Sequence, residues 1–330
     1  MKILTPFLVV VVLAAIAFFG VEVLQLQLLF GVVIPYLCLA LFVIGFIYRI
    51  VRWGRSAVPF RIPTTAGQEK SLPWIKANKL DNPSSKAGVF VRMLLEVLVF
   101  RSLFRNIKVE KHQDRLVFAS AKWLWLGALA FHWSFLIILI RHLGLFMDPI
   151  APFVQILQSG DSFLQIGLPA LFITDVVVLT ALSYLFLRRV VIPRIRYISL
   201  PADYLALLLL IAIVLSGILM RYGFKVDMLA VKEFALGLAT FTPQVTEGIG
   251  AIFYVHLFLV SVLFAYFPLS KLMHAGGIFF SPTRNMANNN RAVRHVNPWN
   301  YPVKVHTYEE YEDDFREKMK KAGIPVDRSE

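Results

Sequence analysis

Six apolar runs separated by polar segments dominate the hydrophobic pattern of this 330-residue chain. Each run holds about 20 residues, the length that an α-helix needs to cross the hydrocarbon core of a bilayer. The pattern therefore predicts an all-α, polytopic transmembrane bundle of six helices. The runs lie near residues 4–23, 28–50, 123–146, 165–187, 201–221 and 249–270.

The first run reads as a retained helix rather than as a cleaved signal peptide. Only Met1 and Lys2 precede it, and the residues that follow it do not form a small-residue cleavage site. We therefore expect residues 1–52 to hold two N-terminal transmembrane helices, and residues 123–280 to hold a four-helix core.

Two long polar segments flank that core. Residues 53–122 are basic, and their first part, which carries many Pro, Ser, Asn and Lys residues, predicts a loop. Their second part, residues 89–104, is apolar with charges at near-helical spacing, which predicts an amphipathic helix in the membrane interface. A re-entrant or buried helix is the alternative. Residues 281–330 predict a tail, with a charged helix over residues 308–321, that orders on a partner.

The charge of the chain follows its membrane pattern. Of 34 Lys and Arg residues, fifteen lie in residues 49–122, four in 188–196 and ten in 271–330, whereas the intervening turns hold few. Positively charged loops stay in the cytoplasm, so both termini are expected on the cytoplasmic side of the cell's inner membrane. The net charge of +13 does not indicate nucleic-acid binding, because no recognition motif accompanies it.

Cysteine usage limits the redox chemistry of the chain. Cys38 is its single cysteine, whereas an iron–sulfur cluster usually takes four thiolates. The sequence also lacks the C-x-x-C-H motif that attaches haem covalently. Any haem must therefore be held without a covalent bond to the chain.

Four of the seven histidines lie in or at the end of predicted membrane helices. Polar side chains at membrane depth are costly unless they are satisfied, so each is a candidate functional residue. His132 and His142 share the third helix, and His256 and His274 belong to the sixth, which runs antiparallel to it. His142 and His256 then lie toward the outer face, and His132 and His274 toward the inner face. Each pair offers two imidazoles to one iron, which predicts two haems stacked across the membrane.

The two histidine spacings differ. Ten residues in the third helix span about 15 Å and eighteen in the sixth span about 27 Å, at a rise of about 1.5 Å per residue. Straight parallel helices cannot match these levels. Helix tilt accounts for part of the difference, and Pro268 is expected to kink or break the sixth helix and return His274 toward the core.

These histidines carry a resemblance to a known family. The run FPLSKLMH at residues 267–274, with His256 eighteen residues before its end, resembles the last helix of respiratory nitrate reductase gamma subunits. So does His132-Trp-Ser-Phe, with His142 ten residues later. The resemblance covers residues 118–280 and implies a dihaem cytochrome b with the two axial pairs described above.

The ends of the chain differ from the nitrate reductase type. The additional N-terminal helix, the basic segment and the tail motifs NMANNNR and VRHVNPWN resemble the M subunits of the Dsr membrane complex of sulfate reducers. Those subunits in turn resemble the cytochrome of membrane heterodisulfide reductase. The resemblance implies a cytoplasmic iron–sulfur subunit of that type, further membrane and periplasmic subunits, menaquinone, and a role in sulfite or sulfate respiration.

Further charged residues are candidates for binding quinone or the haem propionates. A quinone site needs an apolar slot with polar groups that bond the quinone oxygens and move protons. Arg141, beside His142, is the first candidate for either role. Asp175 in the fourth helix is a candidate proton relay or, equally, a structural hydrogen-bond partner. Candidate propionate partners are Arg221 and Lys232 outside, and Lys122, Arg194 and Lys271 inside, where snorkelling anchors are the alternative.

Three classes of function remain open from the sequence. The first is electron transfer between menaquinol and a cytoplasmic iron–sulfur subunit, with a nitrate reductase-type complex as the alternative setting. The second is a proton channel or transporter that uses the membrane histidines and Asp175 as a relay, although no inverted repeat marks a transporter core. The third is a structural anchor, which would not need four membrane histidines.

Overall fold

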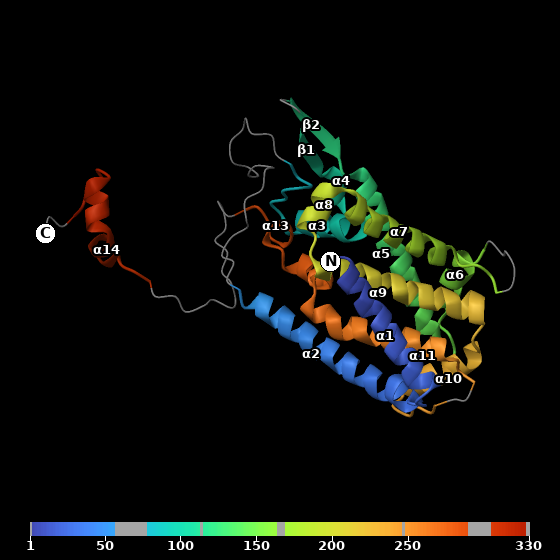
Figure 1. The fold of residues 1–330 in the computed structure, drawn as a ribbon. Coiled ribbons are helices and arrows are strands. Elements are labelled where there is room, and N and C mark those ends of the chain that lie inside the picture. Colours follow the sequence, from blue (N-terminus) through green and yellow to red (C-terminus); the bar gives the residue numbers. More distant parts are fainter. Residues whose placement is uncertain are drawn as a thin grey trace.

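The computed structural model describes residues 2–56, 78–112, 115–163, 169–245, 248–289 and 305–327. Most of these residues lie in helices that form one elongated bundle (Figure 1). The long helices are α1 (Leu4–Glu22), α2 (Ile34–Gly54, preceded by a π-helical turn, Leu29–Val33), α5 (Lys122–His142), α7 (Ile173–Val191), α9 (Pro201–Ile218) and α11 (Ala251–Tyr266). The shorter helices are α3 (Lys86–Val99), α4 (Arg101–Arg105), α6 (Pro152–Asp161), α8 (Pro193–Ile198), α10 (Met228–Ala239), α12 (His274–Gly277), α13 (Pro282–Asn285) and α14 (Tyr308–Lys321).

Within the described residues, five helical segments are long and apolar enough to cross a membrane. They coincide with five of the six predicted runs, and the predicted helical membrane bundle is confirmed. The segments are Leu4–Glu22, Leu29–Gly54, Lys122–Leu145, Pro201–Phe224 and Ala251–Leu269.

The remaining predicted run, residues 165–187, was placed too early. Residues 169–172, which include Pro169, are not helical, and α7 begins at Ile173. Proline cannot donate to a helix interior, and residues 169–172 belong to a loop. α7 also carries three charged residues, Asp175, Arg188 and Arg189, which set it apart from the five more apolar segments.

The long helices pack in a chain of neighbours. α5 packs on α7, α7 on α9, α9 on α11 and α11 on α2, while α1 lies against α9 and α11. The core between them is aromatic and aliphatic, with Phe234, Tyr254 and Leu259 almost fully buried. Gly31 permits one close approach, because a Cβ atom there would lie 2.9 Å from Cζ of Phe234. Small residues of this kind let membrane helices come together.

The shorter elements gather at the two ends of the bundle (Figure 1). α3, α4, α8 and α13 lie at the end that holds the N terminus, where Lys2 Nζ donates to the carbonyl of Tyr197 at 3.1 Å. α6 and α10 lie at the opposite end. We name these the inner and the outer end, after the orientation that the sequence predicts.

The segment before α5 contains more structure than its sequence pattern predicted. The predicted amphipathic helix over residues 89–104 is α3 and α4, divided at Phe100, whose φ of 51° is left-handed and ends the first helix. An unpredicted antiparallel hairpin, β1 (Ile107–His112) with β2 (Arg115–Ser120), follows. The predicted loop over residues 57–77 lies outside the described residues. In the tail, the predicted helix is α14, which begins with a capping box between Thr307 and Glu310.

Candidate functional site: two histidine pairs and an outer polar network

The structure brings together the histidines that the sequence paired. His132 on α5 and His274 at the start of α12 have ring centroids 5.9 Å apart and nearly perpendicular planes. His142, at the end of α5, lies close enough to His256 on α11 for the two rings to interact electrostatically. One pair therefore lies toward the inner end of the bundle and the other toward the outer end.

The unequal histidine spacings are reconciled by a break in the last helix. α11 ends at Tyr266, a 3-10 turn covers Phe267–Leu269, and Ser270 is extended with ψ of 177°. Pro268 is almost fully buried in this turn, where it contacts the position of Gly45 on α2. The chain then turns back before His274. The break that the sequence analysis expected at Pro268 therefore brings His274 to the level of His132.

All four imidazoles are oriented in the way that metal-bound histidines usually are. In each, Nδ1 is engaged in a hydrogen bond, which fixes the ring and leaves Nε2 for a metal. All four rings also keep accessible surface, since two are exposed and two are half-buried. The Nδ1 contacts are His132 to Ala128 O (2.7 Å), His142 to Ile138 O (2.7 Å), His274 to Lys271 O (2.9 Å) and His256 to Ser216 Oγ (2.9 Å).

The spacing within the inner pair also fits an iron between two imidazoles. Two rings bonded on opposite sides of one metal ion at about 2 Å place their centres roughly 6 Å apart. The His132 and His274 centroids are 5.9 Å apart. The donor set and its geometry therefore suit a haem with two histidine ligands.

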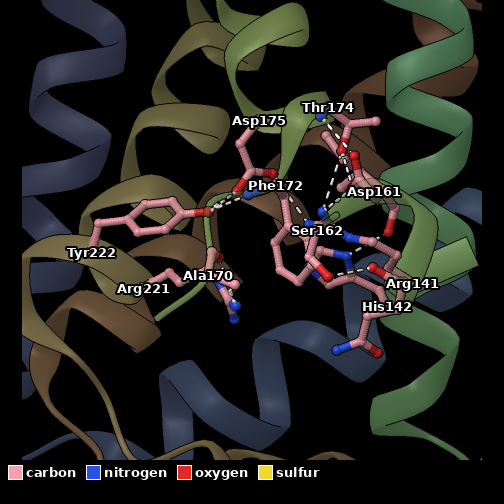
Figure 2. Close-up of polar contacts among 12 residues, drawn as sticks. Arg141, His142, Asp161, Ser162, Ala170, Phe172, Thr174, Asp175, Arg221 and Tyr222 are labelled. Carbon is pink, nitrogen blue, oxygen red and sulfur yellow. Dashed lines mark hydrogen bonds and ion pairs between the residues drawn. The ribbon is translucent and has the colours of Figure 1, made fainter. Parts of the chain in front are cut away.

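A buried network of charged residues lies beside the outer pair (Figure 2). Arg141, which precedes His142 on α5, forms an ion pair with Asp161 at the end of α6. The same guanidinium donates to Oγ1 of Thr174 at 3.2 Å and to Oδ1 of Asp175 at 3.1 Å, both on α7. All three acceptors are at least nine-tenths buried. Buried charges are tolerated when they are paired in this way, so the network joins α5, α6 and α7.

Two aromatic residues complete the network. The Tyr222 hydroxyl donates to Oδ2 of Asp175 at 3.0 Å and accepts from the backbone N–H of Phe172 at 3.0 Å. The guanidinium carbons of Arg141 and Arg221 lie 3.6 and 4.1 Å from the centroid of the Phe172 ring. Cations are attracted to the face of an aromatic ring, so Phe172 lies between the two arginines and spaces them. Figure 2 shows Tyr222 and Arg141 on opposite sides of Asp175 and Phe172.

Arg221 is also tied to the outer pair through its own helix. Ser216 bonds to His256, and a Cβ atom on Gly217 would lie 3.3 Å from Cε1 of His256. Arg221 follows one helical turn later and donates to the carbonyl of Ala170 at 3.2 Å. Its Nε is buried without a hydrogen-bond partner among the described residues, so it retains a donor for an anionic group.

The three lysines that were predicted to bind haem propionates contact other residues. Lys232 pairs with Asp148 at 3.1 Å, and Lys271, largely exposed, pairs with Asp203 at 2.8 Å. Lys122 is exposed at the start of α5, with its Nζ 5.5 Å from the centroid of the Phe104 ring. Each of these three side chains therefore has a contact of its own, and their role as propionate partners stays a prediction.

Several residues of the site were not identified from the sequence. Asp161, Thr174 and Tyr222 hold Arg141 and Asp175 in place, yet they lie in three different segments. Asp161 was visible as a carboxylate in the predicted outer segment that follows Arg141, twenty residues later in the chain. Tyr222 gave no such signal, because tyrosines commonly lie at membrane interfaces for other reasons.

Comparison with known proteins adds the family context. The nitrate reductase gamma-subunit family matches residues 89–295. A protein of Archaeoglobus fulgidus named Hdr-like menaquinol oxidoreductase cytochrome b-like subunit is 49% identical over 282 residues, which cover 83% of this chain and 84% of the relative. A protein of the same name from Archaeoglobus profundus is 46% identical over 275 residues, or 81% of each chain.

Proposed function

The chain belongs to the nitrate reductase gamma-subunit family, and from this premise we propose that it carries electrons between menaquinol and a cytoplasmic partner through two haems b. The observation that supports this most strongly is the arrangement of the four histidines in two pairs. In each histidine Nδ1 is engaged in a hydrogen bond and Nε2 is available. His132 and His274 would bind the inner haem, and His142 and His256 the outer. The haem irons, when bound, supply one-electron carriers on either side of the bundle.

We place quinol oxidation at the outer end, because the groups that handle protons lie there. Oxidation of a quinol releases two protons, which need acceptors near its hydroxyl groups. Asp175 carries a carboxylate that can take a proton, and the Tyr222 hydroxyl is hydrogen-bonded to that carboxylate. Arg141 holds the Asp175 carboxylate in position through an ion pair at 3.1 Å. Arg221 has a free donor and lies one turn beyond Gly217, which faces His256, so it is the better outer propionate partner, whereas Lys232 is already paired.

The partner is proposed from the names of the relatives together with the tail motifs. Those relatives are named as subunits of a menaquinol oxidoreductase of Hdr-like type. We propose that residues 123–280 form the haem-binding core, and that residues 53–122 and 281–330 face a cytoplasmic iron–sulfur subunit. Both termini then lie in the cytoplasm. Sulfite or sulfate respiration is the proposed setting, and a nitrate reductase-type complex is the less favoured one.

One experiment tests the function directly. The purified protein is mixed without oxygen with a reduced naphthoquinol, and the absorbance of the haem is followed. We expect a b-type spectrum that becomes reduced by the quinol. A protein without haem, or with haem that quinol does not reduce, would contradict the proposal and favour the proton-channel alternative, in which proton flux into vesicles would be seen instead.

A further inference from the structure

At the inner end, α3 buries the charged residues that an interfacial helix would normally expose. Arg92 and Glu96 are each only 7% exposed. The helix is therefore turned with its charged face toward the protein and its apolar face outward, where lipid or a neighbouring membrane subunit would cover it. The exposed apolar residues of α3 are Phe90, Val91, Leu94, Val97, Leu98 and Val99.

The buried face of α3 carries more positive charge than it can neutralise. Glu96 accepts from the backbone N–H and the hydroxyl of Ser102, and lies 3.8 Å from Nε of Arg284 on α13. Arg101 is engaged with Asp81 at 3.1 Å. Burial lowers the pKa of the Arg92 guanidinium, and the positive charges of Arg284 and Arg101 oppose the favourable influence of Glu96. Glu96 is thus shared between two arginines and a serine.

Several nitrogen atoms of this cluster lack partners. Among the described residues, Nε and Nη1 of Arg92 and Nε of Arg284 are buried and have no hydrogen-bond acceptor. A buried donor left unpaired costs about 1–3 kcal/mol, and more when the group is charged. A planar guanidinium with two free donors fits the two oxygens of a carboxylate. The cluster is therefore built to receive an oxyanion.

The helices that carry Arg92 and Arg284 are linked to the segments that carry the inner histidines. The ring of Phe100, at the end of α3, lies edge-on to His132 with centroids 4.9 Å apart. The indoles of Trp125 and Trp133 on α5 donate to the carbonyls at the end of α3 at 2.7 and 2.9 Å. Arg284 follows His274 by ten residues, on a helix that packs against α3.

We propose that Arg92 and Arg284 bind the propionate carboxylates of the haem held by His132 and His274, an assignment that rests on the proposed function. The carboxylate is more consistent with the geometry than a lipid phosphate, because the arginines face the interior while the lipid-accessible face of α3 is apolar. These arginines take the role that the sequence analysis gave to Lys122 and Lys271, which have other contacts.

The test is an optical redox titration of the purified holoprotein and of its Arg92→Gln and Arg284→Gln variants. A propionate that loses its arginine keeps a negative charge beside the iron, which stabilises the ferric state. We expect the midpoint potential of the inner haem to fall and to become more dependent on pH, while that of the outer haem stays unchanged. Arg92→Lys should recover part of the loss. Arg105→Gln removes the same charge from an exposed pair with Asp81 and should leave both potentials unchanged.

Other outcomes would overturn the assignment. An inner potential equal to that of the wild type in both glutamine variants would do so, as would an equal shift of both haems. Loss of a co-purified phospholipid at unchanged potentials would instead make the cluster a headgroup site. If Arg92→Gln does not assemble, Arg284→Gln, with a side chain 33% exposed, decides the matter. A wild-type protein without haem would overturn the proposed function as well, whereas two haems with unshifted potentials would overturn this inference alone.

Discussion

The two ends of the bundle both carry buried arginines, but they neutralise those arginines differently. At the outer end, Arg141 meets Asp161, Thr174 and Asp175, and every contact is at hydrogen-bond distance. At the inner end, Arg92 has free donors and faces a glutamate that is largely occupied by its own neighbours. Among the described residues, Arg141 is therefore paired by protein groups at the outer end, whereas Arg92 at the inner end, like Arg221 at the outer end, keeps a donor for an added anion.

This difference fits a division of labour between the ends. A site that oxidises quinol must take up protons, which requires carboxylates that can exchange them, and the outer network supplies two. A site that only passes electrons onward needs no proton acceptor, and gains from cations that stabilise the reduced haem.

Removal of an outer histidine should abolish quinol chemistry. His256→Ala should lose the outer haem. Addition of naphthoquinol should then reduce the remaining haem no faster than addition of buffer alone. His274→Ala should lose the inner haem yet keep an outer haem that quinol reduces. The measurement is anaerobic stopped-flow absorbance at the haem bands. If His256→Ala still accepted electrons from quinol at the wild-type rate, quinol oxidation would not belong to the outer end.

Loss of Asp161 should destabilise the outer end. Asp161→Ala leaves a buried arginine with half of its carboxylate partners, and breaking such a pair typically costs 3–5 kcal/mol, with about 3 kcal/mol expected because Asp175 remains. At the inner end, Asp81→Ala affects pairs with partly exposed arginines and should cost about 1 kcal/mol or less. Thermal unfolding in detergent compares the two. Equal losses of unfolding free energy in the two variants would mean that the outer ion pairs stabilise the protein no more than the inner ones.

Neutralising Asp175 should slow quinol oxidation without loss of haem. Asp175→Asn keeps the size of the side chain and one acceptor oxygen but loses the carboxylate that can accept a proton, and a positioned acid–base group contributes roughly 10²-fold or more. Asp148→Asn is a matched control, since that carboxylate is 71% exposed. Both variants should retain two haems. A wild-type rate in Asp175→Asn would leave this residue with a structural role only.

A small change beside His256 should be confined to the outer haem. In Gly217→Ala the added Cβ lies 3.3 Å from Cε1 of His256, so the ring must move by a few tenths of an ångström. We expect a small shift in the low-spin haem signal of the outer pair by electron paramagnetic resonance, and none in the inner signal. Gly223→Ala, whose nearest neighbour would be 3.7 Å away, is the control. A change in the inner signal alone would contradict the placement of His256.

The sequence predicted the membrane bundle and the grouping of the histidines, because both depend on patterns that are local in the chain. Apolar runs mark spans, and antiparallel helices determine which histidines meet. The polar networks depend on contacts between distant segments. Arg141 was identified beside His142, but its partner Asp161 comes from another helix and Tyr222 from a third.

The orientation of α3 was also beyond the sequence pattern. A helix with one charged and one apolar face can bury either, depending on what surrounds it. Here Glu96 has two partners. Ser102 lies beyond the break at Phe100, and Arg284 lies nearly two hundred residues later in the chain. The left-handed φ of Phe100 is likewise a tertiary effect, since large side chains rarely adopt it.

The central claim is that four histidines bind two haems, and the ratio of haem to chain tests it most directly. A pyridine haemochrome assay on quantified protein should give two haems b per chain in the wild type and one in each of His132→Ala, His142→Ala, His256→Ala and His274→Ala. A wild-type protein with no haem, or four variants that each keep two, would contradict the account.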